Sequence, residues 1–353
     1  MTIARPSTRR ARGMQGLIAA AAAMLSLAGC GEDAGTATVL KVHHFVPLGS
    51  TIHKDMIAPW CEKLALESDG ALRCQIFPAM QLGGNATQLY DQAREGVVDI
   101  AFAVPGFTAG RFPRIEVFEL PFMMRDAEAS SRALWRYVER HASEEFADVR
   151  PLAFNVHGPG LFHTVDRPIR TRADLAGLSM RAPTRQSSKL LAALGATPVG
   201  MPLPQVPEAL SRGVIDGLIV PWEIVPAIKA DELTRHHSET PPSRPAIYTT
   251  AFVFAMNRAR YEALPAAQRA VLDANSGLEL SARFGRVMQA ADALGRMSVA
   301  PASITLIDAG EIDRWQALTR PVIDAWVSEM NARGHDGAAL LVAARALSEE
   351  YAR

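Results

Sequence analysis

The chain has 353 residues, with 37 basic and 37 acidic side chains, so its formal net charge at pH 7 is zero. Hydrophobic residues make up 48% of the sequence and charged residues 21%, which is ordinary for a globular protein. Such a chain lacks the basic surplus that nucleic-acid binding requires, and its length suggests about two lobes.

The N-terminal segment has the pattern of a bacterial export signal. Four arginines precede an apolar run, 14–28, that is too short for a membrane span and typical of the hydrophobic region of a signal peptide. The run ends in Leu27-Ala28-Gly29-Cys30, which resembles the lipobox of bacterial lipoproteins, where the cysteine carries the lipid. The alternatives are a soluble N-terminal helix and, from Arg9-Arg10, a weak twin-arginine signal.

We therefore predict a signal peptide at 1–29, lipidation of Cys30 and a small, polar tether at 30–38. The predicted leader holds four arginines and no acids, so the mature chain would have 33 basic and 37 acidic side chains. This negative balance again argues against nucleic acid as a partner. No later stretch is apolar for long enough to cross a bilayer, so the lipid is the predicted link to the membrane.

The two remaining cysteines can pair. Cys61 falls in a helix predicted at 57–68, and Cys74 falls in the strand that returns after the Asp69-Gly70 turn. A helix packed on the following strand brings two such Cα atoms into bridging range, and an exported protein meets an oxidising compartment. We predict a Cys61–Cys74 disulfide. Two buried free thiols are the alternative, and a zinc site would need more ligands than lie nearby.

Strands and helices alternate along the first half of the folded chain. The expected strands are 39–45, 71–77, 96–104 and 149–157, and the expected helices are 53–68, 85–95 and 126–146. This alternation predicts a mostly parallel sheet with both faces covered. Ligands gather at the carboxyl ends of strands in such sheets, and here those ends are Phe45, Phe77 and Val104.

The second half continues the pattern after a crossover at 158–160. The expected helices are 185–194 and 204–212, the expected strands are 214–220 and 248–256, and a long helical region at 265–296 is expected to be shared between lobes.

One motif occurs twice, as Arg94-Glu-Gly-Val-Val-Asp99 and as Arg212-Gly-Val-Ile-Asp216. It suggests two similarly built lobes; two ordinary helix-to-strand turns with a glycine cap are the alternative.

Arg181 is the candidate binding residue that the local sequence singles out. Gly177 favours a chain reversal, 178–182 alternates as a short strand, and Pro183 ends it. A guanidinium at the end of a strand is rigidly mounted, and its planar fork matches a carboxylate with two hydrogen bonds. A surface ion pair is the alternative reading of Arg181.

Motifs for catalysis are missing. The sequence has no Gly-x-Ser-x-Gly elbow, no phosphate-binding loop, and no Gly-x-Gly-x-x-Gly after the first strand. The pairs His43-His44 and His236-His237 cannot chelate a metal as pairs, because adjacent residues of a strand point to opposite faces. A serine–histidine–aspartate triad assembled only in three dimensions remains open. We predict no catalytic residue, no cofactor and no metal site.

Five stretches together carry a family resemblance. They are 77–84 (FPAMQLGG), 96–102 (GVVDIAF), 118–122 (FELPF), 174–183 (DLAGLSMRAP) with Arg167-Pro-Ile before it, and 207–217 (PEALSRGVIDG). In this order they resemble the solute-binding proteins of tripartite ATP-independent periplasmic (TRAP) transporters, the DctP-like family, over nearly all of the mature chain. The family's carboxylate-binding arginine falls on Arg181.

The resemblance implies an α/β fold of two lobes, like that of periplasmic binding proteins, with mostly parallel sheets, a ligand cleft between the lobes and a long helix crossing both. We expect lobe I at 39–158 plus 246–286 and lobe II at 159–245 plus 287–353. The resemblance also implies closure around a small organic acid and its delivery to the sodium-coupled permease subunits of a TRAP transporter. We expect a periplasmic, lipid-anchored monomer.

Departures from the family narrow the expected ligand. Where relatives that bind sialic acid have polar residues, this chain has Phe45, Val104, Leu161 and Val220, and Leu161 replaces a second arginine. Such a wall argues against a sugar acid, whose hydroxyl groups would lose their hydrogen bonds at roughly 1–3 kcal/mol each. Relatives that bind 2-oxo acids through a metal carry Glu-Trp where this chain has Ile219-Val220, so we expect no such metal.

The predicted ligand site therefore combines one strong cation with an apolar wall. Its predicted residues are Arg181, Phe45, Val104, Leu161, Thr184, Val220, Trp222, His157 and Tyr248. A monocarboxylate with an apolar or aromatic body fits this lining better than a dicarboxylate. If the apolar side chains are core instead, the lining would be polar, with Thr184, Gln186, His157 and Tyr248.

Two other functions stay open at this point. One is an enzyme that acts on a small organic acid on the same two-lobed scaffold, and the other is a binding protein that serves a different class of transporter. Ligand-induced thermal stabilisation without turnover separates a binding protein from an enzyme.

Overall fold

The computed structural model describes residues 1–4 and 37–352. The predicted lipidation site Cys30, most of the predicted signal peptide and the tether up to residue 36 lie outside the described residues. The structure discussed below belongs to one unit, Thr38–Arg353. No helix in the described ranges is both long enough and apolar enough to cross a membrane.

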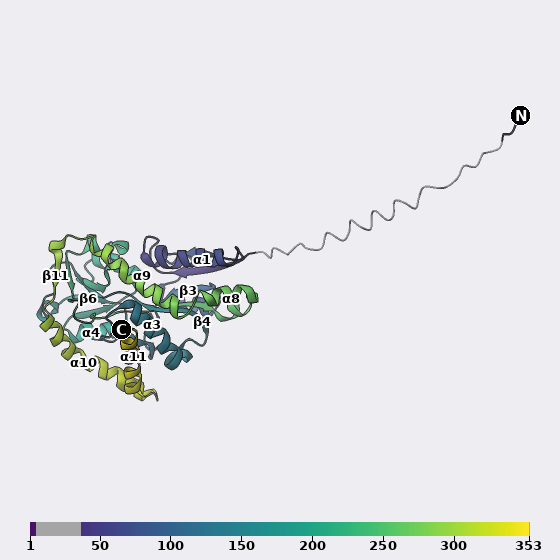
Figure 1. The fold of residues 1–353 in the computed structure, drawn as a ribbon. Coiled ribbons are helices and arrows are strands. Elements are labelled where there is room, and N and C mark those ends of the chain that lie inside the picture. Colours follow the sequence, from purple (N-terminus) through teal and green to yellow (C-terminus); the bar gives the residue numbers. More distant parts are fainter. Residues whose placement is uncertain (5–36, 353) are drawn as a thin grey trace. The chain divides into compact units, whose positions relative to one another are not determined.

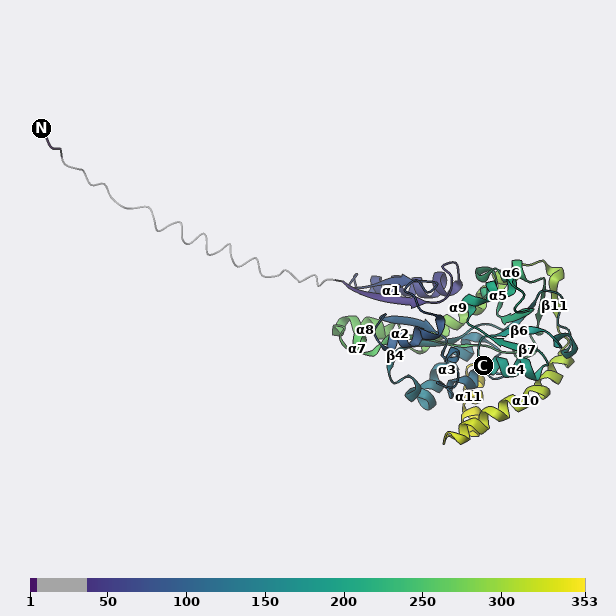
Figure 2. The ribbon, with the colours of Figure 1, turned by 180° about the vertical axis from the view of Figure 1, so that it is seen from behind.

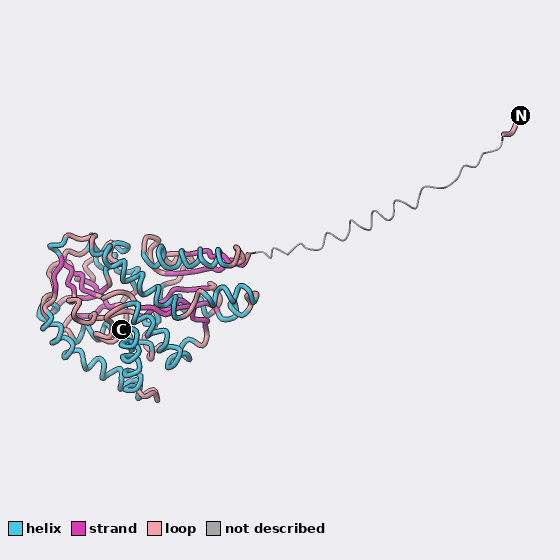
Figure 3. Tube along the Cα trace, in the orientation of Figure 1, coloured by secondary structure: helices cyan, strands magenta, loops and turns pink. Residues whose placement is uncertain are grey.

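Two β-sheets organise this unit (Figures 1 and 3). The first has the order β2 (Leu72–Phe77), β1 (Thr38–His44), β3 (Ile100–Ala103), β10 (Ala251–Asn257), β4 (Val149–Val156). The second has the order β11 (Ile304–Leu306), β9 (His236–Glu239), β5 (Leu161–Thr164), β8 (Gly217–Val220), β6 (Ser179–Ala182), β7 (Thr197–Gly200). We call the elements around the first sheet lobe I and those around the second lobe II.

The predicted two-lobed α/β fold is confirmed, and both sheets are mixed. In lobe I, β1 pairs in parallel with β2 and β3, whereas β10 lies antiparallel between β3 and β4. In lobe II, β6 pairs in parallel with β7 and β8, whereas β5 runs antiparallel to β8 and β9. Strand β10 follows lobe II in sequence but completes the sheet of lobe I, so the chain crosses between the lobes more than once.

Helices flank the two sheets (Figure 2). They are α1 (Ala58–Glu67), α2 (Leu89–Arg94), α3 (Ala127–Tyr137), α4 (Arg185–Ala193), α5 (Val206–Ser211), α6 (Ala230–Leu233), α7 (Arg258–Glu262), α8 (Ala266–Ala274), α9 (Leu278–Arg296), α10 (Ala309–Ala332) and α11 (Gly337–Tyr351). Helix α9 packs on α3 and β4 of lobe I and on the short helix η9 (Trp222–Ile224) of lobe II, so it spans both lobes.

The expected helical region at 265–296 consists of two helices, α8 and α9. Gly277 separates α8 from α9 with a φ of +87°, a conformation that side-chain-bearing residues rarely adopt. Its amide donates to the carbonyl of Leu152 at 2.7 Å, which ties the break to lobe I.

The lobe boundaries expected from the sequence stay a prediction. They assign helix α11 to lobe II, whereas in the structure α11 packs on α3 of lobe I.

The repeated glycine–aspartate motif has the same structural role in both lobes. Gly96 and Gly213 end helices α2 and α5 with φ of +76° and +64°. The carboxylate of Asp99 then accepts a hydrogen bond from the amide of Lys41 in the neighbouring strand, at 2.7 Å. Asp216 accepts one from the amide of Ser179 at the same distance. Each aspartate therefore fixes the strand beside it, which supports the reading of two similarly built lobes.

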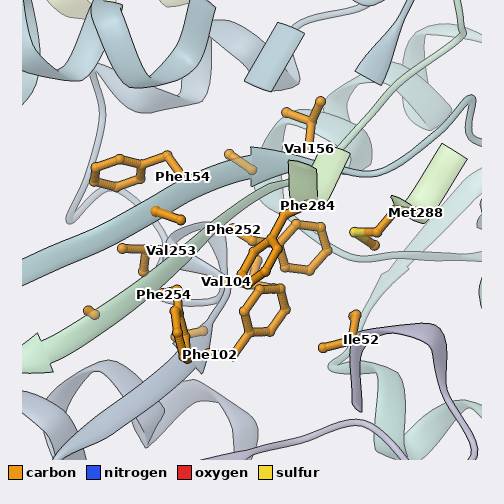
Figure 4. Close-up of a cluster of buried hydrophobic side chains, with 14 of the residues drawn as sticks. Ile52, Phe102, Val104, Phe154, Val156, Phe252, Val253, Phe254, Phe284 and Met288 are labelled. Carbon is orange, nitrogen blue, oxygen red and sulfur yellow. The ribbon is translucent and has the colours of Figure 1, made fainter. Parts of the chain in front are cut away.

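Aromatic side chains fill the core of lobe I (Figure 4). The rings of Phe102 and Phe252 stack with their centroids 5.1 Å apart, and Phe254 meets Phe284 of helix α9 at 5.9 Å. At the outer edge of the same lobe, Cys61 of α1 and Cys74 of β2 form the predicted disulfide, with their Cα atoms 5.6 Å apart.

Candidate functional site

A cavity lies where the two lobes meet. Lobe I contributes Phe45, Val46, Ile52, Val104, Phe107 and Phe252; lobe II contributes Arg181, Pro183, Leu203, Val220, Pro221, Glu223 and Ile224; the connecting segments contribute His157, Tyr248 and Thr250. Phe45 and Val104 directly follow strands β1 and β3, as expected for a site at the carboxyl ends of strands. The lining is mostly apolar, and its ionisable or strongly polar members are few.

Arg181 brings a positive charge into this cavity, and no acidic side chain of the described chain pairs with it. Its side chain lies on β6 and the residue is 2% exposed. Its Nε donates to the carbonyl of Met201 at 3.0 Å and its Nη1 to that of Ile219 at 3.4 Å. Burial lowers the pKa of Arg181 to about 10, so it stays charged at neutral pH. Among residues 37–352, Arg181 forms no ion pair, so its charge is left for a ligand.

His157 and Tyr248 are neutral neighbours of this cation. Their rings meet edge to face at 5.3 Å, and the Nδ1 of His157 donates to the carbonyl of Gly158 at 2.6 Å. Burial lowers the pKa of His157 to about 4, and the charge of Arg181 adds to that effect. Burial also raises the pKa of Tyr248 above its ordinary value. Both side chains can therefore take part in hydrogen bonds without adding charge.

Lobe I supplies an aromatic wall. The ring of Phe45 lies 6.5 Å from that of Phe102 in a stacked arrangement and meets Phe107 edge to face at 5.7 Å. Phe252 continues the wall toward His157, whose ring is 6.1 Å away. A flat apolar ligand body would meet π-faces and ring edges here, which favours offset stacking.

Glu223 is a second polar group in the cavity, and the sequence analysis did not select it. Its backbone amide donates to Oδ1 of Asp292 at 2.9 Å, which places helix η9 against α9. Burial raises the pKa of Glu223 well above its ordinary value, and Asp292 adds to the rise. Its Oε2 has no hydrogen-bond partner within the described chain. A single acid in the apolar run 219–225 was the sequence signal that could have identified it.

Six of the nine predicted ligand residues line the cavity and three do not. Those that line it are Phe45, Val104, His157, Arg181, Val220 and Tyr248. Leu161 is a buried core residue opposite Val220 in the β5–β8 pair. Thr184 caps helix α4. Trp222 turns away from the cavity and donates from its indole nitrogen to Glu239 at 2.7 Å. Strand alternation would have placed Trp222 on the side of Val220, but η9 begins at Trp222 and rotates the chain.

The histidine pairs that drew attention in the sequence make separate contacts. His43 bonds the side chain of Gln92 at 2.7 Å, and His44 bonds His53 at 2.9 Å. His237 bonds His163 at 2.8 Å. Within the described residues, no group of three or more histidine, cysteine, aspartate or glutamate side chains could hold a metal ion.

Comparison with known proteins places the chain in a family. The model of the family described as bacterial extracellular solute-binding protein, family 7, matches residues 42–329. The chain is 53% identical to a TRAP solute-binding protein from Rhodoferax ferrireducens T118, solved with copurified benzoate; the TM-score is 0.88, and the match covers 89% of this chain and 98% of that one.

Two further solved structures are similar. A marine metagenome TRAP solute-binding protein specific for aromatic acid ligands, solved with 3-hydroxybenzoate, is 43% identical with a TM-score of 0.87, over 90% of this chain and all of that one. One from Bordetella bronchiseptica, with bound (R)- and (S)-mandelate, is 27% identical with a TM-score of 0.80, over 89% and 99% of the two chains. The chain therefore belongs to the bacterial extracellular solute-binding proteins of family 7, the DctP-like receptors of TRAP transporters, which are periplasmic binding proteins and not enzymes.

Proposed function

We propose that this receptor captures an aromatic monocarboxylate, with the ligand's carboxylate paired to Arg181 and its ring against the wall of Phe45, Phe107 and Phe252. The observation that carries the proposal is the buried guanidinium of Arg181, which has no acidic partner in the described chain and faces a mostly apolar cavity. A buried charge of this kind is costly unless a partner with matching hydrogen bonds joins it. A carboxylate supplies both the charge and the two acceptors that a guanidinium fork fits.

The shape and chemistry of the lining favour an aromatic body. Each Å² of apolar ligand surface removed from water contributes about 25 cal/mol, and ring contacts add to this. A second carboxylate would lose its hydration without meeting a second cation. The similar proteins whose structures were solved with benzoate, 3-hydroxybenzoate and mandelate support the same class, because each of these ligands is a monocarboxylate with one aromatic ring.

The transport role has further parts that we propose from the sequence. A lipid on Cys30 would hold the receptor at the membrane surface, and the loaded receptor would deliver its ligand to a sodium-coupled permease as a monomer. Cleavage before Cys30 and lipid attachment are tested together by intact mass of the exported protein against a Cys30→Ser variant. Retention of the full leader, or an unmodified mature N-terminus, would contradict this part of the proposal.

The ligand class is tested by a titration panel on protein refolded from denaturant, which removes copurified ligand. The panel contains benzoate, a phenyl-substituted acid such as mandelate, a branched-chain acid, succinate and glucuronate. We expect the aromatic acids to raise the melting temperature and to bind most tightly by calorimetry, without turnover. If succinate or glucuronate binds most tightly, the argument from the apolar wall is wrong.

A further inference from the structure

The carboxyl group of Glu223 is not explained by capture of a carboxylate at Arg181. Glu223 lines the same cavity and is 7% exposed, yet its Oε2 has no hydrogen-bond partner within the described chain. Within residues 37–352 it also forms no ion pair, so it does not serve as a counter-ion for Arg181. Val220, Pro221 and Ile224, the lining residues next to it in sequence, offer no side-chain hydrogen bond. A polar atom left unsatisfied in an apolar wall calls for an explanation.

The backbone that carries Glu223 is fixed from two sides, so its position is well defined. Its amide donates to Asp292 of helix α9 at 2.9 Å. The same helix presents Gly295, where an added Cβ would lie 2.0 Å from the carbonyl oxygen of Trp222. On the other side, the indole of Trp222 donates to Glu239 at 2.7 Å, and Glu239 in turn accepts from Arg296 at 2.7 Å. Helix η9 is therefore clamped between α9 and strand β9.

The protonation state of Glu223 decides which ligand group it can meet. Burial raises its pKa well above the ordinary value, which favours the neutral carboxyl group, with one O–H donor and free acceptor capacity. A second carboxylate on the ligand would remain a desolvated charge without a cation there. A hydroxyl group can both donate to and accept from a neutral carboxyl group, so it satisfies Oε2 without bringing in charge.

We propose that Glu223 is a specificity-determining residue that forms a hydrogen bond with a hydroxyl group on the ligand's ring, remote from the carboxylate held by Arg181. This inference rests on the proposed function and narrows its ligand class from aromatic monocarboxylates to hydroxy-substituted ones. Arg181 then supplies affinity for every aromatic acid, and Glu223 selects among them.

The test compares benzoate, the three ring isomers of hydroxybenzoate and the corresponding methoxybenzoates by calorimetry on refolded wild-type protein. We expect at least one hydroxybenzoate to bind about tenfold more tightly than benzoate, and its methoxy analogue, which cannot donate, to lose that advantage. Equal affinities of benzoate and all three hydroxybenzoates would overturn the inference and leave the proposed function standing. If no aromatic acid binds at all, the proposed function itself fails.

Variants separate recognition from a structural role. In Glu223→Met the ratio of hydroxybenzoate affinity to benzoate affinity should fall to about one, because the side chain can no longer bond the hydroxyl group. Glu223→Gln, which keeps a donor and an acceptor, should retain part of the preference. Glu119→Gln is the matched control, because Glu119 is also a buried acid, 2% exposed, but is not among the residues that line the cavity. A Glu223→Met protein that keeps the full preference would overturn the inference.

Discussion

Arg185 of lobe II holds the buried carboxylate of Glu116 of lobe I, with its Nε 2.7 Å from Oε1 and its Nη2 2.6 Å from Oε2. The same guanidinium binds Glu329 of helix α10 through two further hydrogen bonds of 2.9 Å each. Gln186, the next residue, donates to Glu116 at 2.6 Å. This cluster joins the lobes only a few residues after Arg181, so it fixes the start of α4 beside the cavity.

Removing Arg185 should be strongly destabilising. In Arg185→Met, Glu116 and Glu329 lose their shared cation, and Glu116 is only 2% exposed. Breaking one side of a buried ion pair typically costs about 3–5 kcal/mol of unfolding free energy. Urea unfolding measures this loss. Arg286→Met is the control, because the Arg286 side chain is 57% exposed in its pair with Glu128, which should contribute less than about 1 kcal/mol. Equal stability of the two variants would show that the cluster does not hold the lobes.

The Cys61–Cys74 disulfide should stabilise the fold without affecting the ligand. It closes a short loop, with a sequence separation of 13, between α1 and β2. On the chain-entropy model a loop of this size contributes roughly 3 kcal/mol to the unfolding free energy. The double variant Cys61→Ser, Cys74→Ser should therefore unfold at a lower urea concentration and bind benzoate with unchanged affinity, because neither cysteine lines the cavity. Two free thiols in the exported wild-type protein would refute the pairing.

His163 should make the fold sensitive to acid. Its Nδ1 lies 2.8 Å from Nδ1 of His237, and burial, aided by His237, lowers the pKa of His163 to about 3. In the unfolded chain this histidine has a pKa of about 6.5, so below that pH the unfolded chain binds a proton at His163 and the folded protein does not. Lowering the pH from 7 to 5 therefore removes about 2 kcal/mol of unfolding free energy through this residue.

The pH dependence of the wild type's unfolding free energy does not isolate the contribution of His163. Two buried acids act in the opposite direction, because burial raises the pKa of Glu119 to about 8 and that of Asp292 to about 7. The folded protein therefore takes up protons at these acids before the unfolded chain does, and acidification raises the unfolding free energy through them. The stability difference between wild type and His163→Asn isolates the histidine. That difference should shift in favour of the variant by about 2 kcal/mol between pH 7 and pH 5. A difference that does not change with pH would contradict the prediction.

Sequence patterns predicted which residues line the cavity wherever strand geometry alone decides side-chain direction. Phe45 and Val104 follow buried strands of lobe I, and Arg181 and Val220 lie at the ends of strands of lobe II, so all four meet at the cavity. The glycine–aspartate repeat predicted two similar lobes because a helix cap and a strand anchor are local features. The Cys61–Cys74 pairing followed from a helix and the strand directly after it.

Sequence patterns did not predict the orientation of side chains that depends on packing against residues far away in sequence. Trp222 was expected at the ligand, but a short 3₁₀ helix begins there after Pro221, and the indole nitrogen donates to Glu239. Glu223, for which no role was predicted, lines the cavity instead. Thr184 was expected at the ligand but caps α4. The break at Gly277 depends on a hydrogen bond to Leu152, which is far away in sequence. No periodicity in the sequence carries that information.

The central claim is that Arg181 binds the ligand's carboxylate, and calorimetry of benzoate on refolded Arg181→Ala and Arg181→Lys proteins tests it most directly. The alanine variant should fold and lose about 3–5 kcal/mol of binding free energy, since a charge-assisted, two-point contact in a closed cavity is removed. The lysine variant should recover little, because an ammonium group cannot reproduce the fork. Unchanged affinity of Arg181→Ala for benzoate would contradict the account.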